Sequence, residues 1–206
     1  MLPTLIVFGD KTANEVLEAA KLAHSESFGT MERLYFEEPT FTEVHLPKHR
    51  QSGADCYYNI GVADVVVKQR IQKRCEEIGW IPFTVVHPTA VVSPTARLGN
   101  GVFVGPLAIV STSAYVGDHS IVHLHASIGH DATIGEHCVI LPGARISGSA
   151  ILGNRVLIGS NAFVNAGVRI GHDCQVDALT YVSRELLDWH VLSVRAKRAM
   201  KRSERD

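Results

Sequence analysis

The sequence predicts an α/β N-terminal Rossmann-like domain followed by an all-β parallel β-helix. Two observations support this division. Before residue 86, short apolar runs typical of buried strands alternate with helical patterns. From Val86 to Val182, every sixth residue is Ile, Leu or Val, without an exception. A β-sandwich would not keep that phase over so long a stretch, whereas a coil built from hexapeptides requires it.

The N-terminal elements follow in order along the chain. We expect strands at 5–8, 34–36, 56–60 and 81–86, a first helix that begins at a capping box, Thr12–Glu15, and a second helix ended by Gly79. The second helix turns Val67, Ile71, Cys75 and Ile78 inward. The predicted domains are residues 1–85, the β-helix at 86–183 and a basic tail at 184–206.

Loops after the first three strands lie where parallel sheets bind ligands. Gly9 is followed by Asp10, Lys11 and Thr12 rather than by a GxGxxG fingerprint, which argues against a tightly bound dinucleotide. Lys11 and Thr12 precede a helix, and a helix N-terminus can hold a phosphate. A solvated turn is the alternative interpretation.

The hexapeptides predict a prism with three flat sides. Three hexads make one coil, so residues 18 apart stack about 4.8 Å apart, the spacing of paired strands. The fourth residue after each aliphatic is small, most often Ala, because the narrow interior has no room for two large side chains. Gly after the aliphatic is expected to give the turn its backbone freedom. Cys138 and Cys174 lie two coils apart, about 9.6 Å, which is too far for a disulfide.

One histidine has surroundings that suit catalysis. His130 comes two residues after an inward aliphatic, so it should project outward near a corner, with Asp131 able to orient its ring. Gly148 lies one coil further on and offers an open backbone N–H. The three residues form a candidate general base with an oxyanion donor.

Other histidines have plainer interpretations. His172-Asp173 repeats the Gly-His-Asp triplet on a different side of the prism. His119 and His137 are one coil apart, and we expect them to stack on the surface. His125 and His130 have a spacing similar to that of the zinc ligands of γ-class carbonic anhydrases, but the third ligand would fall near Thr89 or Pro94. We therefore expect no metal.

The chain consists of 206 residues with a net charge of −1 and 46% hydrophobic residues, as in globular proteins. The charge balance gives no reason to expect nucleic acid as a partner. No apolar stretch approaches the roughly 20 residues that span a bilayer, the N-terminus has no basic region typical of a secretory signal, and four cysteines lack CxxC spacing. We expect a cytoplasmic protein without membrane insertion.

Taken together, these features resemble the hexapeptide-repeat sugar acetyltransferases, in particular the nucleotide-amino-sugar N-acetyltransferases and the sialic-acid O-acetyltransferases. The resemblance covers nearly the whole chain. It rests on His-Pro-Thr-Ala-Val-Val-Ser-Pro-Thr-Ala at 87–96 and on Ile-Gly-His-Asp-Ala-Thr-Ile-Gly at 128–135. It implies a left-handed β-helix, a homotrimer with active sites between prisms, and acetyl-CoA as co-substrate without a metal.

The resemblance also implies roles for individual residues. His130 would be the catalytic base, Asp131 its partner and Gly148 a backbone donor near the thioester. The nucleotide-linked sugar would contact Gly9, Asp10, Lys11, Thr12, Glu37, Glu38, Gly61 and His123, where His123 replaces a common Asn. Arg195 and Lys197 of the basic tail would meet the phosphates of CoA, although a solvated helix is an equal alternative for this tail.

The expected function is therefore acetyl-CoA-dependent N-acetylation of an amino group, at C4 by preference, on a nucleotide-linked deoxysugar for bacterial surface glycans. Three alternatives stay open: a sugar O-acetyltransferase, a γ-carbonic-anhydrase-like zinc enzyme and a non-catalytic β-helix scaffold.

Overall fold

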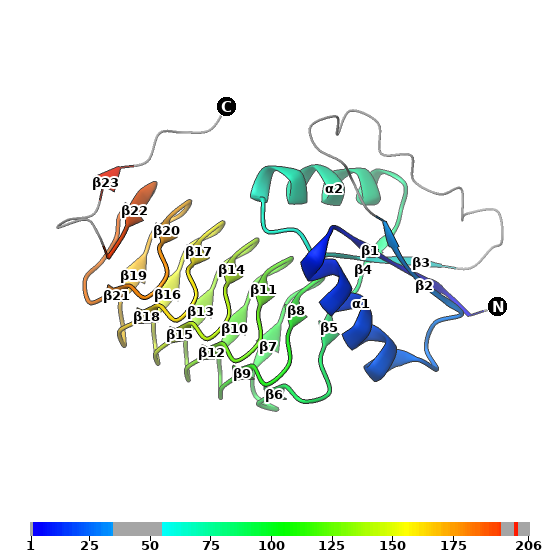
Figure 1. The fold of residues 1–206 in the computed structure, drawn as a ribbon, viewed down its shortest axis with the longest axis horizontal. Coiled ribbons are helices and arrows are strands. Elements are labelled where there is room, and N and C mark those ends of the chain that lie inside the picture. Colours follow the sequence, from blue (N-terminus) through cyan, green and yellow to red (C-terminus); the bar gives the residue numbers. More distant parts are fainter. Residues whose placement is uncertain (1, 35–54, 195–199, 202–206) are drawn as a thin grey trace.

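The computed structural model describes residues 2–34, 55–194 and 200–201. A small α/β part sits at one end of a long stack of coils, and the C-terminal strands lie at the other end (Figure 1). Of the predicted site residues, Glu37, Glu38, Arg195 and Lys197 lie outside the described residues.

The α/β part is a four-stranded parallel sheet with a helix on each face. Its elements are β1 (Thr4–Phe8), α1 (Lys11–His24), β2 (Thr30–Leu34), β3 (Cys56–Ile60), α2 (Val65–Glu77) and β4 (Ile81–Pro82), and the strand order is β2-β1-β3-β4. Leu5 and Val7 of β1 pack with α1, whereas Ile6 and Phe8 pack with α2. Because the described residues include only these two helices, the structure shows an α/β unit without showing a complete Rossmann-like domain.

Two local predictions for this part are wrong, and a third is tested only at its first residue. Helix α1 begins at Lys11 with Asp10 at its N-cap and no side-chain cap, so Thr12 does not open a capping box. The second strand already begins at Thr30, where it pairs with Thr4, four residues before the predicted start at Leu34; Tyr35 and Phe36 lie outside the described residues. The stretch 81–86 is two strands in different sheets, β4 and β5 (Val85–Val86), where the chain passes from one part to the other.

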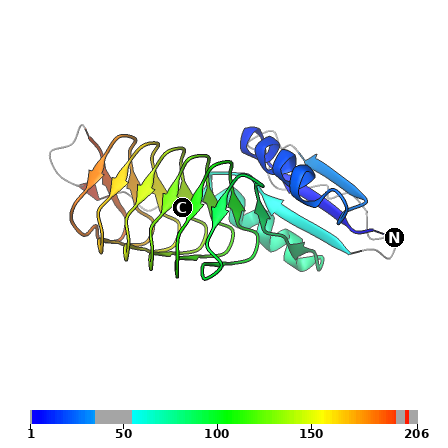
Figure 2. The same cartoon turned by 90° about the horizontal axis from the view of Figure 1, so that it is seen from below.

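The prism has the predicted three faces, which Figure 2 shows from below. The first face contains β5, β8 (Phe103–Val104), β11 (Ile121–Val122), β14 (Val139–Ile140), β17 (Leu157–Ile158) and β20 (Gln175–Val176). The second contains β6 (Val91–Val92), β9 (Ile109–Val110), β12 (Ser127–Ile128), β15 (Arg145–Ile146), β18 (Phe163–Val164) and β21 (Tyr181–Val182). The third contains β7 (Arg97–Leu98), β10 (Tyr115–Val116), β13 (Thr133–Ile134), β16 (Ile151–Leu152) and β19 (Arg169–Ile170).

The predicted register is confirmed, since Tyr115 pairs with Thr133 and Ile128 with Ile146, 18 residues apart. The coils form a left-handed parallel β-helix. The repeated aliphatic and small residues form one continuous core, including Ile128, Ala132, Ile134 and Cys138. All four cysteines are free and buried, as expected for small core residues.

The glycine after each aliphatic has a different role from the predicted one. A Cβ at Gly129 would lie 2.5 Å from the backbone nitrogen of Gly148 on the next coil, so close approach of the coils requires glycine there. The left-handed backbone falls two residues later, on side chains such as His119 (φ 55°) and Asp131 (φ 58°). Most coils thus turn at ordinary residues, although Gly101, Gly143 and Gly167 take the same left-handed position, and the glycine directly after the aliphatic serves close contact.

The α/β part packs on the first face at the start of the prism. Helix α1 forms a buried cluster with Val85, Phe103 and Ile121, the outward residues of β5, β8 and β11. Asn59 at the end of β3 donates to the carbonyl of Phe83 (2.8 Å) and that of Gly101 (3.2 Å). The loops that follow β1 and β3 are therefore fixed relative to the coils.

Strand pairing continues beyond residue 183 at the far end of the prism. β22 (His190–Leu192) pairs in parallel with β20, and β23 (Met200–Lys201) pairs antiparallel with β22. Within the described residues, no helix has the length and apolar character needed to span a membrane.

Candidate active site

His130 and Asp131 project from the corner between the second and third faces, called here the His130 corner. The ring Nδ1 lies 2.8 Å from Oδ2 of Asp131, and the two side chains are 64% and 59% exposed. Because a carboxylate can only accept, this contact places the proton on Nδ1. The lone pair of Nε2 is then available to a substrate, as a general base requires.

Gly148, one coil further on, lies directly beside this ring. A Cβ on Gly148 would fall 2.4 Å from Nε2 of His130, so only glycine leaves the ring its place. The Gly148 N–H has no acceptor among the residues that the structure describes. The structure therefore brings together His130, Asp131 and Gly148, and the backbone N–H of Gly148 is unused.

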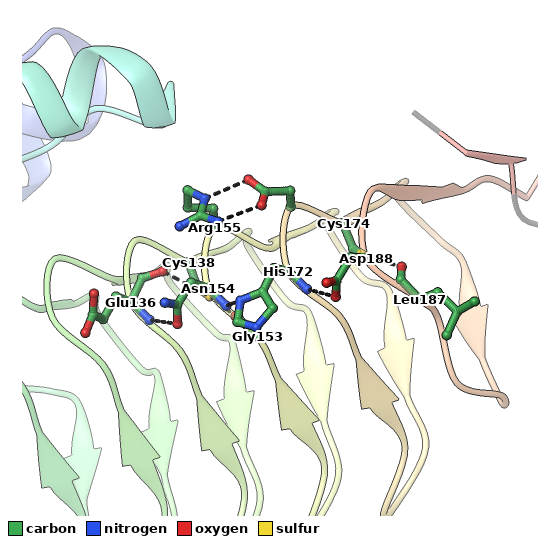
Figure 3. Close-up of polar contacts among 10 residues, drawn as sticks. Glu136, Cys138, Gly153, Asn154, Arg155, His172, Cys174, Leu187 and Asp188 are labelled. Atoms are coloured by element: carbon green, nitrogen blue, oxygen red, sulfur yellow. Dashed lines mark hydrogen bonds and ion pairs between the residues drawn. The ribbon is translucent and has the colours of Figure 1, made fainter. Parts of the chain in front are cut away.

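The second Gly-His-Asp triplet lies at a different corner, as predicted, between the third and first faces; we call it the His172 corner. Nδ1 of His172 accepts the N–H of Asn154 at 3.0 Å (Figure 3). Asp173 turns to Arg155 and accepts from Nε and Nη2, both at 2.7 Å. Since Nδ1 is an acceptor here, Nε2 of His172 carries the proton and has no free lone pair.

A cavity of about 900 Å³ lies on the third face, between its last strands and the segment 185–190. Thr133, the first residue of β13, lines it only three residues after His130. Ile151 and Leu152 give it an apolar floor, and Arg169 and His190 add polar groups toward the C-terminal end. The cavity thus runs along the prism axis, away from the α/β part.

The predicted nucleotide-binding loops come together at the C-terminal ends of β1 and β3. A Cβ at Gly9 (φ 126°) would lie 2.6 Å from the carbonyl oxygen of Gly61, and one at Gly61 would lie 2.6 Å from the nitrogen of Ala13. Lys11 and Thr12 form the first turn of α1 beside these glycines. Asp10 lies 3.9 Å from Arg33 of β2. The structure thus brings Gly9, Gly61 and the first turn of α1 together, with Asp10 and Lys11 exposed.

His123 does not lie on this open surface. It is at the corner between the first and second faces, and its side chain is only 8% exposed. Its Nδ1 lies 3.6 Å from Oε2 of Glu15 on α1. Burial, and then the Lys68 ammonium, lower the pKa of His123 to about 4. Sequence reasoning missed Glu15.

His119 and His137 stack on each other as predicted, but they are buried and not on the surface as we expected. The rings lie 5.4 Å apart at 16°, and Tyr58 of β3 stacks on His119 at 5.8 Å. Both histidines are buried because α2 covers this part of the His172 corner, where Lys68 donates from Nζ to the carbonyl of His119 at 2.9 Å. Helical spacing could have revealed Lys68, since it precedes the inward Ile71 and Cys75 by three and seven residues.

Burial shifts the pKa values of this cluster strongly. It lowers that of the Lys68 ammonium to about 7. Burial and the neighbouring Lys68 lower the pKa of His119 to about 4 and of His137 to about 3. Among the described residues, no group of three or more His, Cys, Asp or Glu side chains is placed to hold a metal ion.

Comparisons with known proteins agree with this architecture. The family model of the hexapeptide repeat of succinyl-transferase matches residues 149–184. PerB from Caulobacter crescentus, solved with CoA and GDP-perosamine, is 26% identical with a TM-score of 0.84, covering 96% of each chain. A His-to-Asn mutant of perosamine N-acetyltransferase from the same organism, with the same two ligands, is 25% identical with a TM-score of 0.83, covering 98% of this chain and 97% of that one.

A third structure agrees in fold alone. The acetyltransferase domain of PglB from Neisseria gonorrhoeae is 22% identical with a TM-score of 0.82, covering 96% of this chain and 98% of that one. A search of curated sequences finds no match. The repeat, the left-handed coil and the likeness over nearly the full length make the chain similar to the hexapeptide-repeat sugar acetyltransferases.

Proposed function

We propose that the protein transfers the acetyl group of acetyl-CoA to an amino group, at C4 by preference, of a nucleotide-linked deoxysugar, with His130 as the general base. The observation that carries the proposal is the His130 corner. There, Asp131 holds the Nδ1 proton, Nε2 is free, and the backbone of Gly148, whose N–H is unused, lies beside the ring.

These groups support one sequence of bond changes. The sugar amine attacks the thioester carbonyl carbon while Nε2 of His130 takes up a proton from the amine. The Gly148 N–H stabilises the oxyanion of the tetrahedral intermediate. When the C–S bond breaks, the imidazolium returns its proton to the CoA sulfur. The Asp131 carboxylate stabilises the imidazolium at 2.8 Å throughout.

The cavity on the third face suits the CoA chain. Tyr115 and Thr133 line its first part, three residues after His130 in the case of Thr133; Ile151 and Leu152 offer apolar contact to the pantetheine arm, and Arg169 is available to a phosphate. Arg195 and Lys197 are further candidates for the CoA phosphates. The nucleotide of the sugar is assigned to Gly9, Asp10, Lys11, Thr12 and Gly61, where α1 begins, and to Glu37 and Glu38. The complexes of two relatives with CoA and GDP-perosamine support this pair of substrates.

A homotrimer is part of the proposal. Four of the six outward residues on the second face are exposed and apolar, namely Val91 (62%), Ile109 (46%), Phe163 (40%) and Tyr181 (58%), with Ser127 and Arg145 between the two pairs. Such exposed apolar side chains favour association. This face lies between the corners of His123 and His130, so a second copy placed on it would reach both. Light scattering of the purified protein tests the trimer, and a monomer would refute it.

The decisive test measures thiol release from acetyl-CoA against UDP-, dTDP- and GDP-linked 4-amino sugars, with wild type and His130→Ala in parallel. Turnover with one acceptor, lost in the variant, supports the proposal. Turnover only with hydroxyl acceptors would instead indicate an O-acetyltransferase. If neither amino nor hydroxyl acceptors were acetylated, acetyl transfer would be refuted. Metal content and the hydration of CO₂ would then be measured.

A further inference from the structure

Glu15 and His123 form an unusual contact between α1 and the prism. Oε2 of Glu15 and Nδ1 of His123 are 3.6 Å apart, both atoms are buried, and neither has a hydrogen-bond partner. Leaving two facing polar atoms unpaired is costly, and closing the gap by about 0.6 Å would give each a partner.

The pair joins the two halves of the proposed active site. Glu15 lies one turn after Lys11 on α1, next to the loops of Gly9 and Gly61. His123 lies seven residues before His130, and its backbone is held by Ile140 and Ala126 through hydrogen bonds of 2.9 and 3.1 Å. Besides the apolar cluster with Val85, Phe103 and Ile121, the contact with His123 therefore links the N-terminal half of α1 to the prism.

We propose that Glu15 and His123 are a positioning pair, which fixes the N-terminus of α1 over the coil that carries His130. The inference rests on the proposed function. It assigns His123 an indirect role, because a side chain that is 8% exposed and faces Glu15 is covered by α1 rather than open to the sugar.

Once the gap closes to hydrogen-bond distance, the contact would be a hydrogen bond rather than an ion pair. Burial, and then Glu18, raise the pKa of Glu15, while burial and Lys68 lower that of His123. These shifts disfavour the state in which both groups are charged. A neutral imidazole can donate from Nδ1 to the carboxylate, which an asparagine amide could also do.

The test is a double-mutant cycle on the full chain. Glu15→Ala, His123→Ala and their combination are compared with wild type, with His123→Asn as the conservative variant and Lys21→Gln, on the exposed side of α1, as the control. KM for the nucleotide sugar, KM for acetyl-CoA and kcat are measured. In parallel, hydrogen exchange is followed for the amides of α1 and α2.

We expect each alanine variant to raise KM for the nucleotide sugar about 3- to 30-fold, with little further loss in the double variant. KM for acetyl-CoA should stay unchanged, α1 should exchange faster while α2 does not, and His123→Asn should recover most of the loss. Additive losses, or a raised KM without faster exchange in α1, would overturn the proposal and indicate direct substrate contact.

Hydrogen exchange keeps the two proposals separable. If wild type turns over no acceptor, the proposed function fails, and faster exchange of α1 in both alanine variants still supports the pair. Unchanged exchange in both variants refutes the pair whatever the activity.

Discussion

Two corners of one prism carry the same Gly-His-Asp triplet and use it in opposite ways. At the His130 corner, the imidazole bonds to its own neighbour Asp131 and both side chains remain exposed. At the His172 corner, the imidazole accepts from Asn154 and the aspartate pairs with Arg155, both one coil earlier.

The difference comes from residues 18 positions away. Along the His172 corner, each coil offers a polar partner to the next: Asn100 bonds to Asp118, Glu136 to Asn154, Asn154 to His172 and His172 to Asp188. At the His130 corner, Thr112 and Ser113 occupy the matching positions one coil earlier, and among the described residues neither bonds to the side chains of His130 or Asp131, which bond to each other instead. The triplet is thus held by the preceding coil at one corner and left exposed at the other.

The largest expected effect separates the two histidines. His130→Ala should lower kcat of acetyl transfer by about 10²- to 10⁴-fold, because it removes the base. His172→Ala should leave kcat within about twofold, since its Nε2 carries a proton and cannot serve as the base. Thiol release from acetyl-CoA measures both. Equal losses in the two variants would break the distinction between the corners.

Gly148→Ala should lower kcat about 10- to 100-fold with the fold intact. The new methyl would occupy the space of the His130 ring, which is the easiest group to move, and small displacements of a catalytic group are costly. Gly167→Ala is the matched control, because its Cβ would meet nothing within 4 Å although its backbone has φ 68°. That control should lose some stability and no activity.

The two aspartates should separate activity from stability. Asp131→Asn should lower kcat about tenfold or more, because its amide can donate to Nδ1 and select the wrong tautomer. Asp173→Asn should leave kcat unchanged and destabilise the fold by about 1–3 kcal/mol through loss of the charged contacts to Arg155. Rates and thermal unfolding are measured on both variants. A loss of kcat in Asp173→Asn together with a loss of stability in Asp131→Asn would contradict this prediction.

The sequence was enough to predict the coils, because stacking enforces one aliphatic every six residues and one neighbour every 18. It also predicted the exposure of His130 and the position of Gly148. The sequence was not enough where contacts between distant parts of the chain determine the position of a strand or the burial of a side chain. The strand Thr30–Leu34 lacks an apolar pattern and is set by its pairing with β1. The burial of His119 depends on α2, and that of His123 on α1, neither of which the repeat itself specifies.

The smallest effect concerns pH and the buried part of the His172 corner. In the unfolded chain, His119 and His137 take up protons near their ordinary pKa of 6.5, but in the folded protein only near 4 and 3. The unfolded state therefore binds more protons between these values, and stability should fall as the pH is lowered from 7 to 4. We expect a loss on the order of 10 °C in Tm.

The variant His119→Phe/His137→Phe tests whether these two rings are responsible. Phenylalanine keeps the stack on Tyr58 and cannot take up a proton, so the decline in Tm should flatten, although His123 retains a share. His130→Ala and His172→Ala, at exposed sites, should leave the decline as steep as in wild type. If the double variant left the decline of Tm with pH unchanged, α2 would not bury this corner in solution. The contrast between a packed corner and an open one would then apply only to the C-terminal coils.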